Sequence, residues 1–153
     1  MRAVVDTSGW VSAMLSRRGS GLSLINAFET AQFDLVTSEP AHEETEEVLK
    51  RPALVRTGEA RVRAVSLLVA IRERGEFVSI PGDLKVCRDP NDDVVIETAI
   101  RGKVDALVTL DKDLLEDANV LAVLAAAGVR VLMPGQFLAE LRGAAGDDDE
   151  AAP

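Results

Sequence analysis

The sequence predicts an α/β domain in which helices cover both faces of a central, mostly parallel sheet of about five strands. Short, continuous apolar runs recur along the 153-residue chain. Such runs are typical of strands that are buried on both faces, as in a parallel sheet. Segments of helical length separate them, and this alternation indicates a three-layer α/β/α arrangement. The predicted strands are 3–5, 33–38, 76–80, 105–110 and 129–134.

The segments between the strands contain residues that commonly begin and end helices. Ser38 is suited to cap the helix that follows it, and Asp89 does the same ahead of a helix with Pro90 at its first position. Gly128 is a typical residue at the end of a helix. The predicted helices are 20–31, 39–50, 60–74, 90–101, 121–127 and 137–142.

Composition indicates one globular domain. Apolar residues make up 47% of the chain and charged residues 28%, which is sufficient for a buried core. We assign residues 1–142 to this domain and expect the acidic residues 143–153 to form a disordered tail. The single cysteine, Cys87, excludes an internal disulfide. No apolar run reaches the roughly 18 residues that span a membrane, so we expect a cytoplasmic protein with no membrane partner.

The charge balance argues against a nucleic-acid partner when it is taken alone. The net charge is −9, from 26 acidic and 17 basic residues. Four of the acids lie in the tail, however, and the bases occur in clusters, so the composition still allows a local basic surface. The clusters are Arg17–Arg18, Lys50–Arg51 with Arg56, Arg61–Arg63, and Arg72–Arg74.

Two aspartates follow directly after predicted strands. Asp6 comes after the run 3–5, and Asp111 comes after the run 105–110. In parallel sheets, ligands bind beyond the carboxyl ends of the strands. We therefore expect both carboxylates at the same edge of the sheet.

The predicted helix 39–50 adds a third carboxylate. Glu44 lies three residues after Ala41 and four before Val48, which places it nearest the apolar stripe of the helix. The other glutamates of this segment are expected to project into solvent; they are Glu43, Glu46 and Glu47.

The predicted helix 90–101 adds a fourth. Asp92 precedes Ile96 by four residues and Ala99 by seven, so it lies on the apolar stripe, where the positive end of the helix dipole also favours an anion. Asp93 lies at the margin of the stripe and is a secondary candidate.

Buried carboxylates that converge on one place repel one another unless a cation joins them. Oxygen ligands without histidine or cysteine select Mg²⁺ or Mn²⁺ over zinc. We leave His42 out of the site and interpret Cys87 as a small buried apolar residue. The four predicted site residues are Asp6, Glu44, Asp92 and Asp111.

Three further polar residues are secondary candidates. Ser8 and Thr109 could orient ligands through their hydroxyl groups, although local backbone hydrogen bonds also explain residues of this type. Asp113 is expected to cap the helix that follows it.

Five segments of the chain contain these residues: VVDTSGWVSAML, SEPAHEETEEVLKRP, CRDPNDDVVIETAI, ALVTLDKDLL and GVRVLMPGQFL. In order and spacing they resemble PIN-domain nucleases over about residues 3–140, and most closely the subgroup that forms toxins of bacterial toxin–antitoxin systems. The resemblance implies an RNA-cleaving site that uses Mg²⁺ or Mn²⁺, with catalytic residues at Asp6, Glu44, Asp92 and Asp111. Asp113 matches a less constant acidic position, and Ser8 stands where the family commonly has asparagine.

The resemblance also implies roles and partners. Asp6 and Asp92 would be primary metal ligands, Asp111 would bind the metal directly or through water, and Glu44 would complete the pocket or accept a proton from the attacking water. The implied partners are RNA, a cognate antitoxin protein and a second copy of the chain.

Two other enzyme classes fit the sequence less well, and the presence of Ser8 leaves one further alternative open. A haloacid-dehalogenase-type phosphatase needs a second aspartate where this chain has Ser8, and a response-regulator receiver needs an acidic pair before its phosphorylated aspartate. The serious alternative is a PIN-fold binding module with weak or no catalytic activity.

Overall fold

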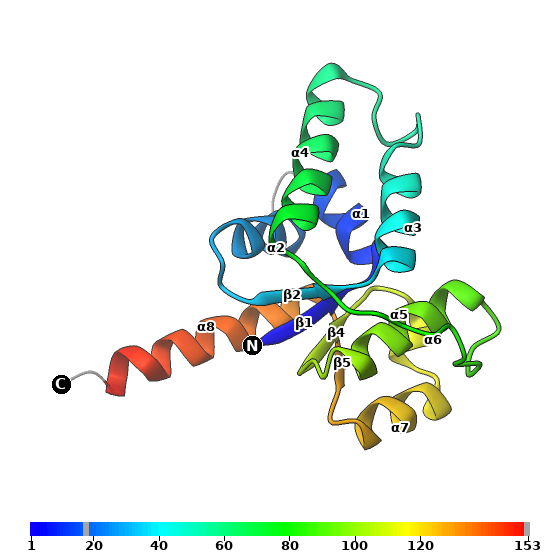
Figure 1. Ribbon diagram of the computed structural model, residues 1–153. Helices are drawn as coiled ribbons and strands as arrows, with labels where there is room; N and C mark the ends of the chain where they lie inside the picture. Colours follow the sequence, from blue (N-terminus) through cyan, green and yellow to red (C-terminus); the bar gives the residue numbers. More distant parts are fainter. Residues whose placement is uncertain (17–18, 152–153) are drawn as a thin grey trace.

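The computed structural model describes residues 1–16 and 19–151 and contains a five-stranded sheet at its centre (Figure 1). The strand order is β3-β2-β1-β4-β5, and every paired strand runs parallel to its neighbour. The predicted α/β fold class is therefore confirmed. The strands are β1 (Arg2–Val5), β2 (Asp34–Thr37), β3 (Glu76–Phe77), β4 (Ala106–Val108) and β5 (Arg130–Leu132).

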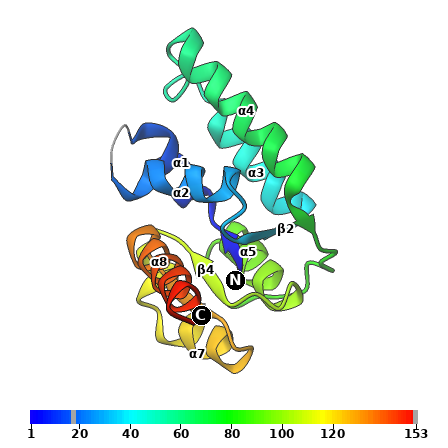
Figure 2. The ribbon, with the colours of Figure 1, turned by 90° about the vertical axis from the view of Figure 1, so that its left-hand side faces the viewer.

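Helices cover both faces of the sheet because successive residues of a strand point to opposite sides. Ala3 and Val5 of β1 pack with the apolar residues of α1, α2, α4 and α8, while Val4 packs with those of α5 and α7 (Figure 2). The helices are α1 (Thr7–Leu15), α2 (Ser20–Glu29), α3 (Glu39–Leu49), α4 (Gly58–Arg74), α5 (Pro90–Arg101), α6 (Lys112–Leu115), α7 (Ala118–Ala126) and α8 (Pro134–Ala151).

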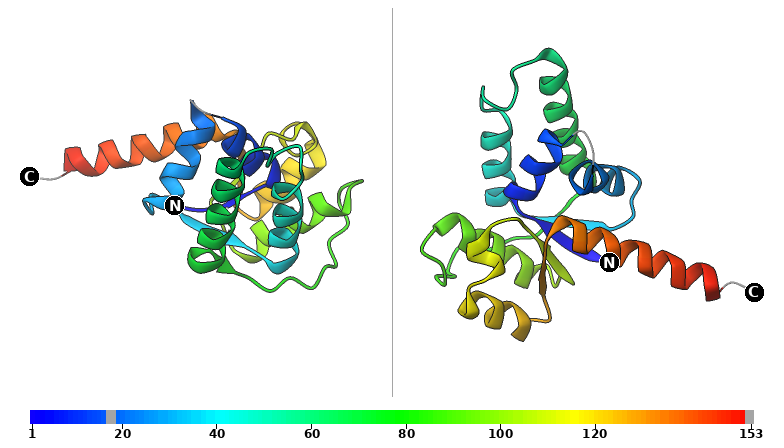
Figure 3. Two further views of the ribbon diagram at one scale, coloured as in Figure 1. Left: turned by 90° about the horizontal axis from the view of Figure 1, so that it is seen from above. Right: turned by 180° about the vertical axis from the view of Figure 1, so that it is seen from behind.

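Helices α3 and α4 form an antiparallel pair that stands away from the sheet, and α8 extends beyond the sheet on another side (Figures 1 and 3). The boundary expected after residue 142 falls within α8, which continues to Ala151; residues 152–153 lie outside the described part of the chain. Arg17–Arg18, one of the basic clusters, also lie outside it. Within the described residues, none of the helices is long and apolar enough to cross a membrane.

Helix α1 is the main element that the sequence did not predict. It begins directly after β1, because Asp6 adopts an extended backbone conformation and its side chain accepts a hydrogen bond from the backbone N–H of Thr7. Asp6 is therefore both the residue after the strand and the N-cap of the next helix. Three predicted helices start earlier than expected. Thr57 and Asp117 cap α4 and α7, and α8 begins at Pro134.

Candidate metal centre

The carboxyl ends of β1 and β4 open into a cavity of about 710 Å³. It is bounded by the starts of α1 and α5, the inner side of α3 and the loop after β4. Both strands end here because they are adjacent and parallel, with Val5 in register with Val108. The acidic residues that line the cavity are Asp6, Glu44, Asp89, Asp92 and Asp111.

Asp6 is fixed by three hydrogen bonds. Its Oδ1 accepts from the backbone N–H of Thr7 at 2.9 Å, and its Oδ2 accepts from Ser8 Oγ and Thr109 Oγ1, both at 2.9 Å. Burial raises the pKa of Asp6, the three hydrogen bonds lower it, and the charge of Asp111 raises it again, with a net upward shift. A carboxylate that is held in this way keeps one orientation, and a nearby cation would stabilise its charged form.

Ser8 and Thr109 also connect the two strand ends. Ser8 Oγ accepts a hydrogen bond from the backbone N–H of Leu110 at 3.1 Å. Thr109 Oγ1 accepts one from the backbone N–H of Asp111 at 3.0 Å. Because both hydroxyl groups donate to Asp6, they link the loop after β4 to the carboxylate at the end of β1. Both residues thus contact Asp6 and position it.

Asp92, Asp111 and Asp113 form a compact oxygen cluster. One carboxylate oxygen of each lies within 4.8 Å of the others. Hard divalent cations have oxygen ligands at about 2.0–2.6 Å, so opposite ligands lie about 4–5 Å apart. The donor set and its spacing therefore fit a divalent metal ion. Asp92 and Asp111 line the cavity, and Asp113 lies beside them in the first turn of α6.

Asp92 has the most perturbed carboxyl group of this cluster. Burial, followed by repulsion from Asp111 and other neighbouring acids, raises its pKa from 3.8 to about 7. A carboxyl group with such a pKa lacks a compensating cation. The raised pKa thus reflects both the burial of Asp92 and the closeness of the other acids, which a bound cation would offset.

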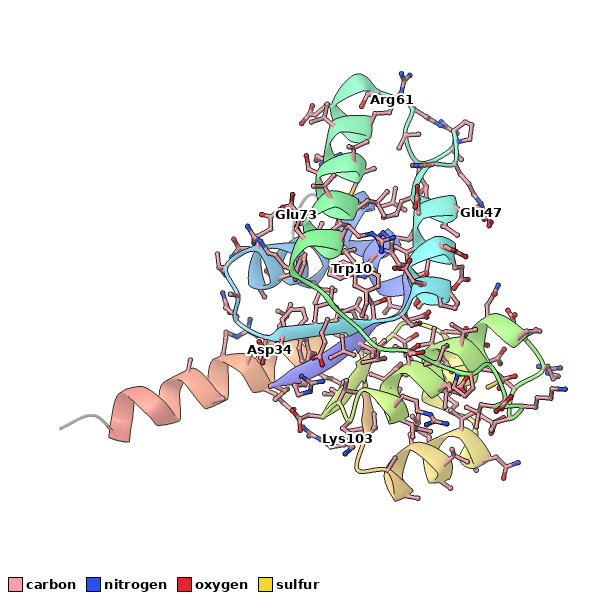
Figure 4. All side chains as sticks on the ribbon, in the orientation of Figure 1. Trp10, Asp34, Glu47, Arg61, Glu73 and Lys103 are labelled. Atoms are coloured by element: carbon pink, nitrogen blue, oxygen red, sulfur yellow. The ribbon has the colours of Figure 1, made fainter. Side chains whose placement is uncertain are left out.

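Glu44 enters the cavity from α3. Its Oε2 is 3.4 Å from the Thr7 hydroxyl group, which donates to it. Burial, followed by the charges of Asp6 and Asp89, raises its pKa. Its neighbour Glu47 has a side chain that is 76% exposed and points away from the cavity (Figure 4).

Asp93 does not line this cavity. Its Oδ1 accepts hydrogen bonds from the backbone N–H groups of Val86 and Cys87, at 2.7 and 2.8 Å. It therefore holds the segment before α5 and faces away from Asp92. Cys87 is half-buried rather than buried, and burial, followed by the charge of Asp93, raises the pKa of its thiol to about 12.

Asp113 does not have the capping role that was expected of it. The N-cap of α6 is Asp111, whose Oδ1 accepts from the backbone N–H of Asp113 at 2.9 Å. Sequence reasoning also missed Asp89, which it explained by capping alone. Asp89 does cap α5, through the backbone N–H of Asn91, but its side chain also lines the cavity. Its position one turn before Asp92 in the sequence could have indicated that it reaches the same cavity.

The remaining lining of the cavity is apolar or carries hydroxyl groups. It comes from the outer turns of α1, from the end of α3 and from the loop after β4; the residues are Val11, Ser12, Leu15, Ser16, Val48 and Leu110. The cavity thus has an acidic half and a largely apolar half. His42 does not line it and instead packs against Phe77 with the ring centroids 5.5 Å apart.

Comparison with known proteins gives one match. The family described as "PIN domain" matches residues 2–113, a range that contains β1 to β4 and all of the acidic residues that line the cavity. No curated protein and no solved structure matches the chain significantly. The matched range covers well over half of the 153 residues, and the parallel sheet with a carboxylate cluster at its edge agrees with the nuclease fold of that family. The chain therefore belongs to the PIN-domain family.

Proposed function

We propose that the chain is a ribonuclease that depends on Mg²⁺ or Mn²⁺ and hydrolyses phosphodiester bonds of RNA. The main support is the oxygen cluster of Asp92, Asp111 and Asp113, within 4.8 Å of one another, next to the buried carboxylate of Asp6. The oxygen-only donor set favours Mg²⁺ or Mn²⁺ over softer metals.

The residues that line the cavity would have different roles in hydrolysis. Asp6, Asp92 and Asp111 would hold the metal ion, with Asp113, the third member of the oxygen cluster, as a further carboxylate beside it. When bound, the ion would stabilise negative charge on the phosphate and make a bound water more acidic. Glu44 faces the same space with a raised pKa, which suits a group that accepts a proton from the attacking water. The hydroxyl group of Ser8 donates a hydrogen bond to Asp6 and keeps it in its orientation. Ser8 can therefore take the place of the asparagine that the family commonly has at this position.

RNA can be accommodated despite the acidic composition. Once the site carboxylates bind a cation and the acids of the tail are set aside, acids and bases nearly balance. Arg56 and Arg61 are exposed near the tip of the α3–α4 pair, and Figure 4 shows Arg61 at this tip. These side chains are candidates for contacts with the phosphate backbone, since such contacts supply most of the non-specific affinity.

The proposed biological role is that of a cytoplasmic toxin with a cognate antitoxin. This role rests on the family, whose members often act in such pairs. Expression of the chain should arrest growth, and co-expression with the small protein encoded beside it should relieve the arrest. Growth arrest that persists with Asp92→Ala would show that RNA cleavage is not its cause.

The proposed second copy of the chain has a specific candidate surface on α4. Val62, Val65 and Val69 recur at helical spacing and are 65%, 53% and 48% exposed. Among the described residues, Arg63 near one end of this stripe and Glu73 near the other take part in no ion pair. An antiparallel pairing of two α4 helices would bury the valines and bring Arg63 of one copy toward Glu73 of the other.

Light scattering during gel filtration tests this surface. Val65→Lys should convert a dimer to a monomer, because it places a charge in the buried seam. Met133→Lys changes another exposed apolar residue, 44% exposed, and should leave the dimer intact. A wild-type chain that stays monomeric at high concentration would contradict the proposed self-association.

The nuclease activity is tested with short RNA and purified protein in the presence of Mg²⁺ or Mn²⁺. Asp92→Asn should reduce cleavage by about 100-fold or more, because it removes a ligand charge. Asp34→Asn is the matched control, since Asp34 is exposed at the start of β2, the end of the strand away from the cavity (Figure 4). If the wild type neither cleaves RNA nor binds Mn²⁺ at millimolar concentration, the chain is the inactive binding module instead.

A further inference from the structure

The cavity beside the acidic cluster is larger than a metal site needs. Its volume is about 710 Å³, whereas a water molecule occupies about 30 Å³, and cavities of about 300–1,000 Å³ hold small organic ligands. The space beyond the carboxylates is therefore available to a part of the substrate.

This additional space has an apolar wall. Leu15 and Leu110 are among the large apolar residues that remain exposed, at 61% and 37%, and both line the cavity. Val11, one turn before Leu15 on α1, and Val48, one turn after Glu44 on α3, also line the cavity. Aliphatic side chains from two helices and a loop are thus continuous with a site that is otherwise made of carboxylates.

We propose that this apolar half, formed by Val11, Leu15, Val48 and Leu110, is a subsite for one unpaired nucleobase next to the phosphate that is cleaved. The inference rests on the proposed function and adds the part of the substrate that the enzyme selects. A nucleotide joins an anionic phosphate to a flat, uncharged ring, which are the two chemistries that the two halves of the cavity accept.

The subsite should distinguish unpaired from paired bases more than it distinguishes one base from another. In a double helix, the faces of the bases are stacked on their neighbours and cannot contact Leu15 or Val48. The apolar residues contact the face of the ring, which all bases have, so the preference among the bases should be weak. The enzyme should therefore cut unpaired RNA with little sequence preference at this one position.

Binding to RNA tests the subsite without any turnover. The Asp92→Asn chain binds short single-stranded RNA labelled with a fluorophore, and anisotropy gives the dissociation constant. Adding Leu15→Ser should weaken binding about 5- to 10-fold, because a large apolar contact with the base is lost. Leu15→Met keeps an apolar side chain of similar size and should bind like Leu15. Met133→Ser is the matched control, since Met133 is a large apolar residue that is 44% exposed and lies outside this cavity.

A second RNA series identifies the base as the partner of Leu15. RNAs that lack one base at successive positions should include one that binds about 5- to 10-fold more weakly than the intact RNA. Leu15→Ser should then have no further effect on that RNA, because the two changes remove the same contact. Equal effects of Leu15→Ser on the intact RNA and on every abasic RNA would overturn the subsite.

The outcomes also separate this inference from the proposed function. Base-dependent binding without cleavage by the wild type would support the subsite and contradict the nuclease. Cleavage of duplex and single-stranded RNA at equal rates would support the nuclease and overturn the subsite. If Leu15→Ser leaves RNA binding unchanged but weakens binding of a partner protein, the apolar half belongs to that protein and the subsite is also overturned.

Discussion

Asp92 and Asp93 are adjacent in the chain, but their carboxylates face different parts of the molecule. Asp92 lines the acidic cavity, while Asp93 accepts hydrogen bonds from the backbone N–H groups of Val86 and Cys87. Successive residues of a helix point about 100° apart, so neighbours at the start of α5 reach separate surroundings. One carboxylate belongs to the candidate site, and the other holds the segment that leads to it.

Asp93→Ala should lower the free energy of unfolding by about 2–3 kcal/mol, because two backbone N–H groups would lose a charged acceptor in a buried place. Asp93→Asn should cost less, since its amide oxygen still accepts hydrogen bonds. Urea denaturation measures both changes. Mn²⁺ affinity should be nearly unchanged in Asp93→Asn, and a loss as large as that of Asp92→Asn would identify Asp93 as a metal ligand instead.

The metal-free protein should lose stability as the pH rises from about 4 to 7. In this interval Asp92, with a pKa of about 7, keeps its proton in the folded protein, whereas in the unfolded chain its pKa is near 3.8 and the proton is lost. The folded state therefore binds more protons, and its stability falls with increasing pH. Asp92→Asn removes this contribution because its side chain stays neutral.

The measurement is the unfolding free energy of both proteins in a chelator at several pH values. Above about pH 7 the variant should be more stable than the wild type by about 1–2 kcal/mol, a value reduced for screening by water at the cavity. Near pH 4 the two should agree. A difference that does not change with pH would contradict the raised pKa of Asp92.

The sequence was sufficient for the sheet and for the acids at its edge. Short apolar runs identified all five strands, and the rule for parallel sheets placed Asp6 and Asp111 at one edge. The structure lines one cavity with these two residues together with Glu44 and Asp92. The pattern worked because α3 has one buried side, so that the position of Glu44 followed from the apolar stripe.

On α5 the same method ranked Asp92 above Asp93, but it did not predict what the other buried acids of this helix do. This helix is buried on several sides, and its buried residues include Asp92, Asp93 and Glu97 as well as the apolar ones. Glu97 accepts hydrogen bonds from the backbone N–H groups of Gly82 and Asp83. An apolar stripe does not reveal which backbone groups a buried carboxylate accepts hydrogen bonds from, so the roles of Asp93 and Glu97 come from the structure alone.

Binding of Mn²⁺ should stabilise the protein and depend on Asp6. At a Mn²⁺ concentration 100 times the dissociation constant, linkage gives about 2.7 kcal/mol, or a rise in melting temperature of about 5–10 °C for a domain of this size. Asp6→Asn should remove most of this rise, whereas Asp34→Asn should retain it, because Asp34 is exposed at the opposite end of β2. An equal rise in wild type and Asp6→Asn would exclude Asp6 as a ligand.

Ser8→Ala should weaken metal binding without unfolding the domain. The change removes the hydrogen bond to Asp6 Oδ2 and the acceptor for the backbone N–H of Leu110, at 2.9 and 3.1 Å. Because the hydrogen bond from Ser8 lowers the pKa of Asp6, its loss should raise that pKa further. Protons then compete better with the metal, so the pH at which Mn²⁺ binding is half-maximal should increase, and RNA cleavage at neutral pH should fall about 10-fold.

Ser8→Asn is the informative partner of that variant, since it introduces the residue that PIN-domain nucleases commonly have here. Its amide can still donate to Asp6, so calorimetry should find Mn²⁺ affinity much closer to the wild type than that of Ser8→Ala. Thr109→Val is a second comparison, because it removes the other hydroxyl donor to Asp6 at 2.9 Å with little change in volume. If Ser8→Ala binds Mn²⁺ with the same pH profile as the wild type while Thr109→Val does not, Thr109 alone positions Asp6, and Ser8 only connects the loop after β4 to α1.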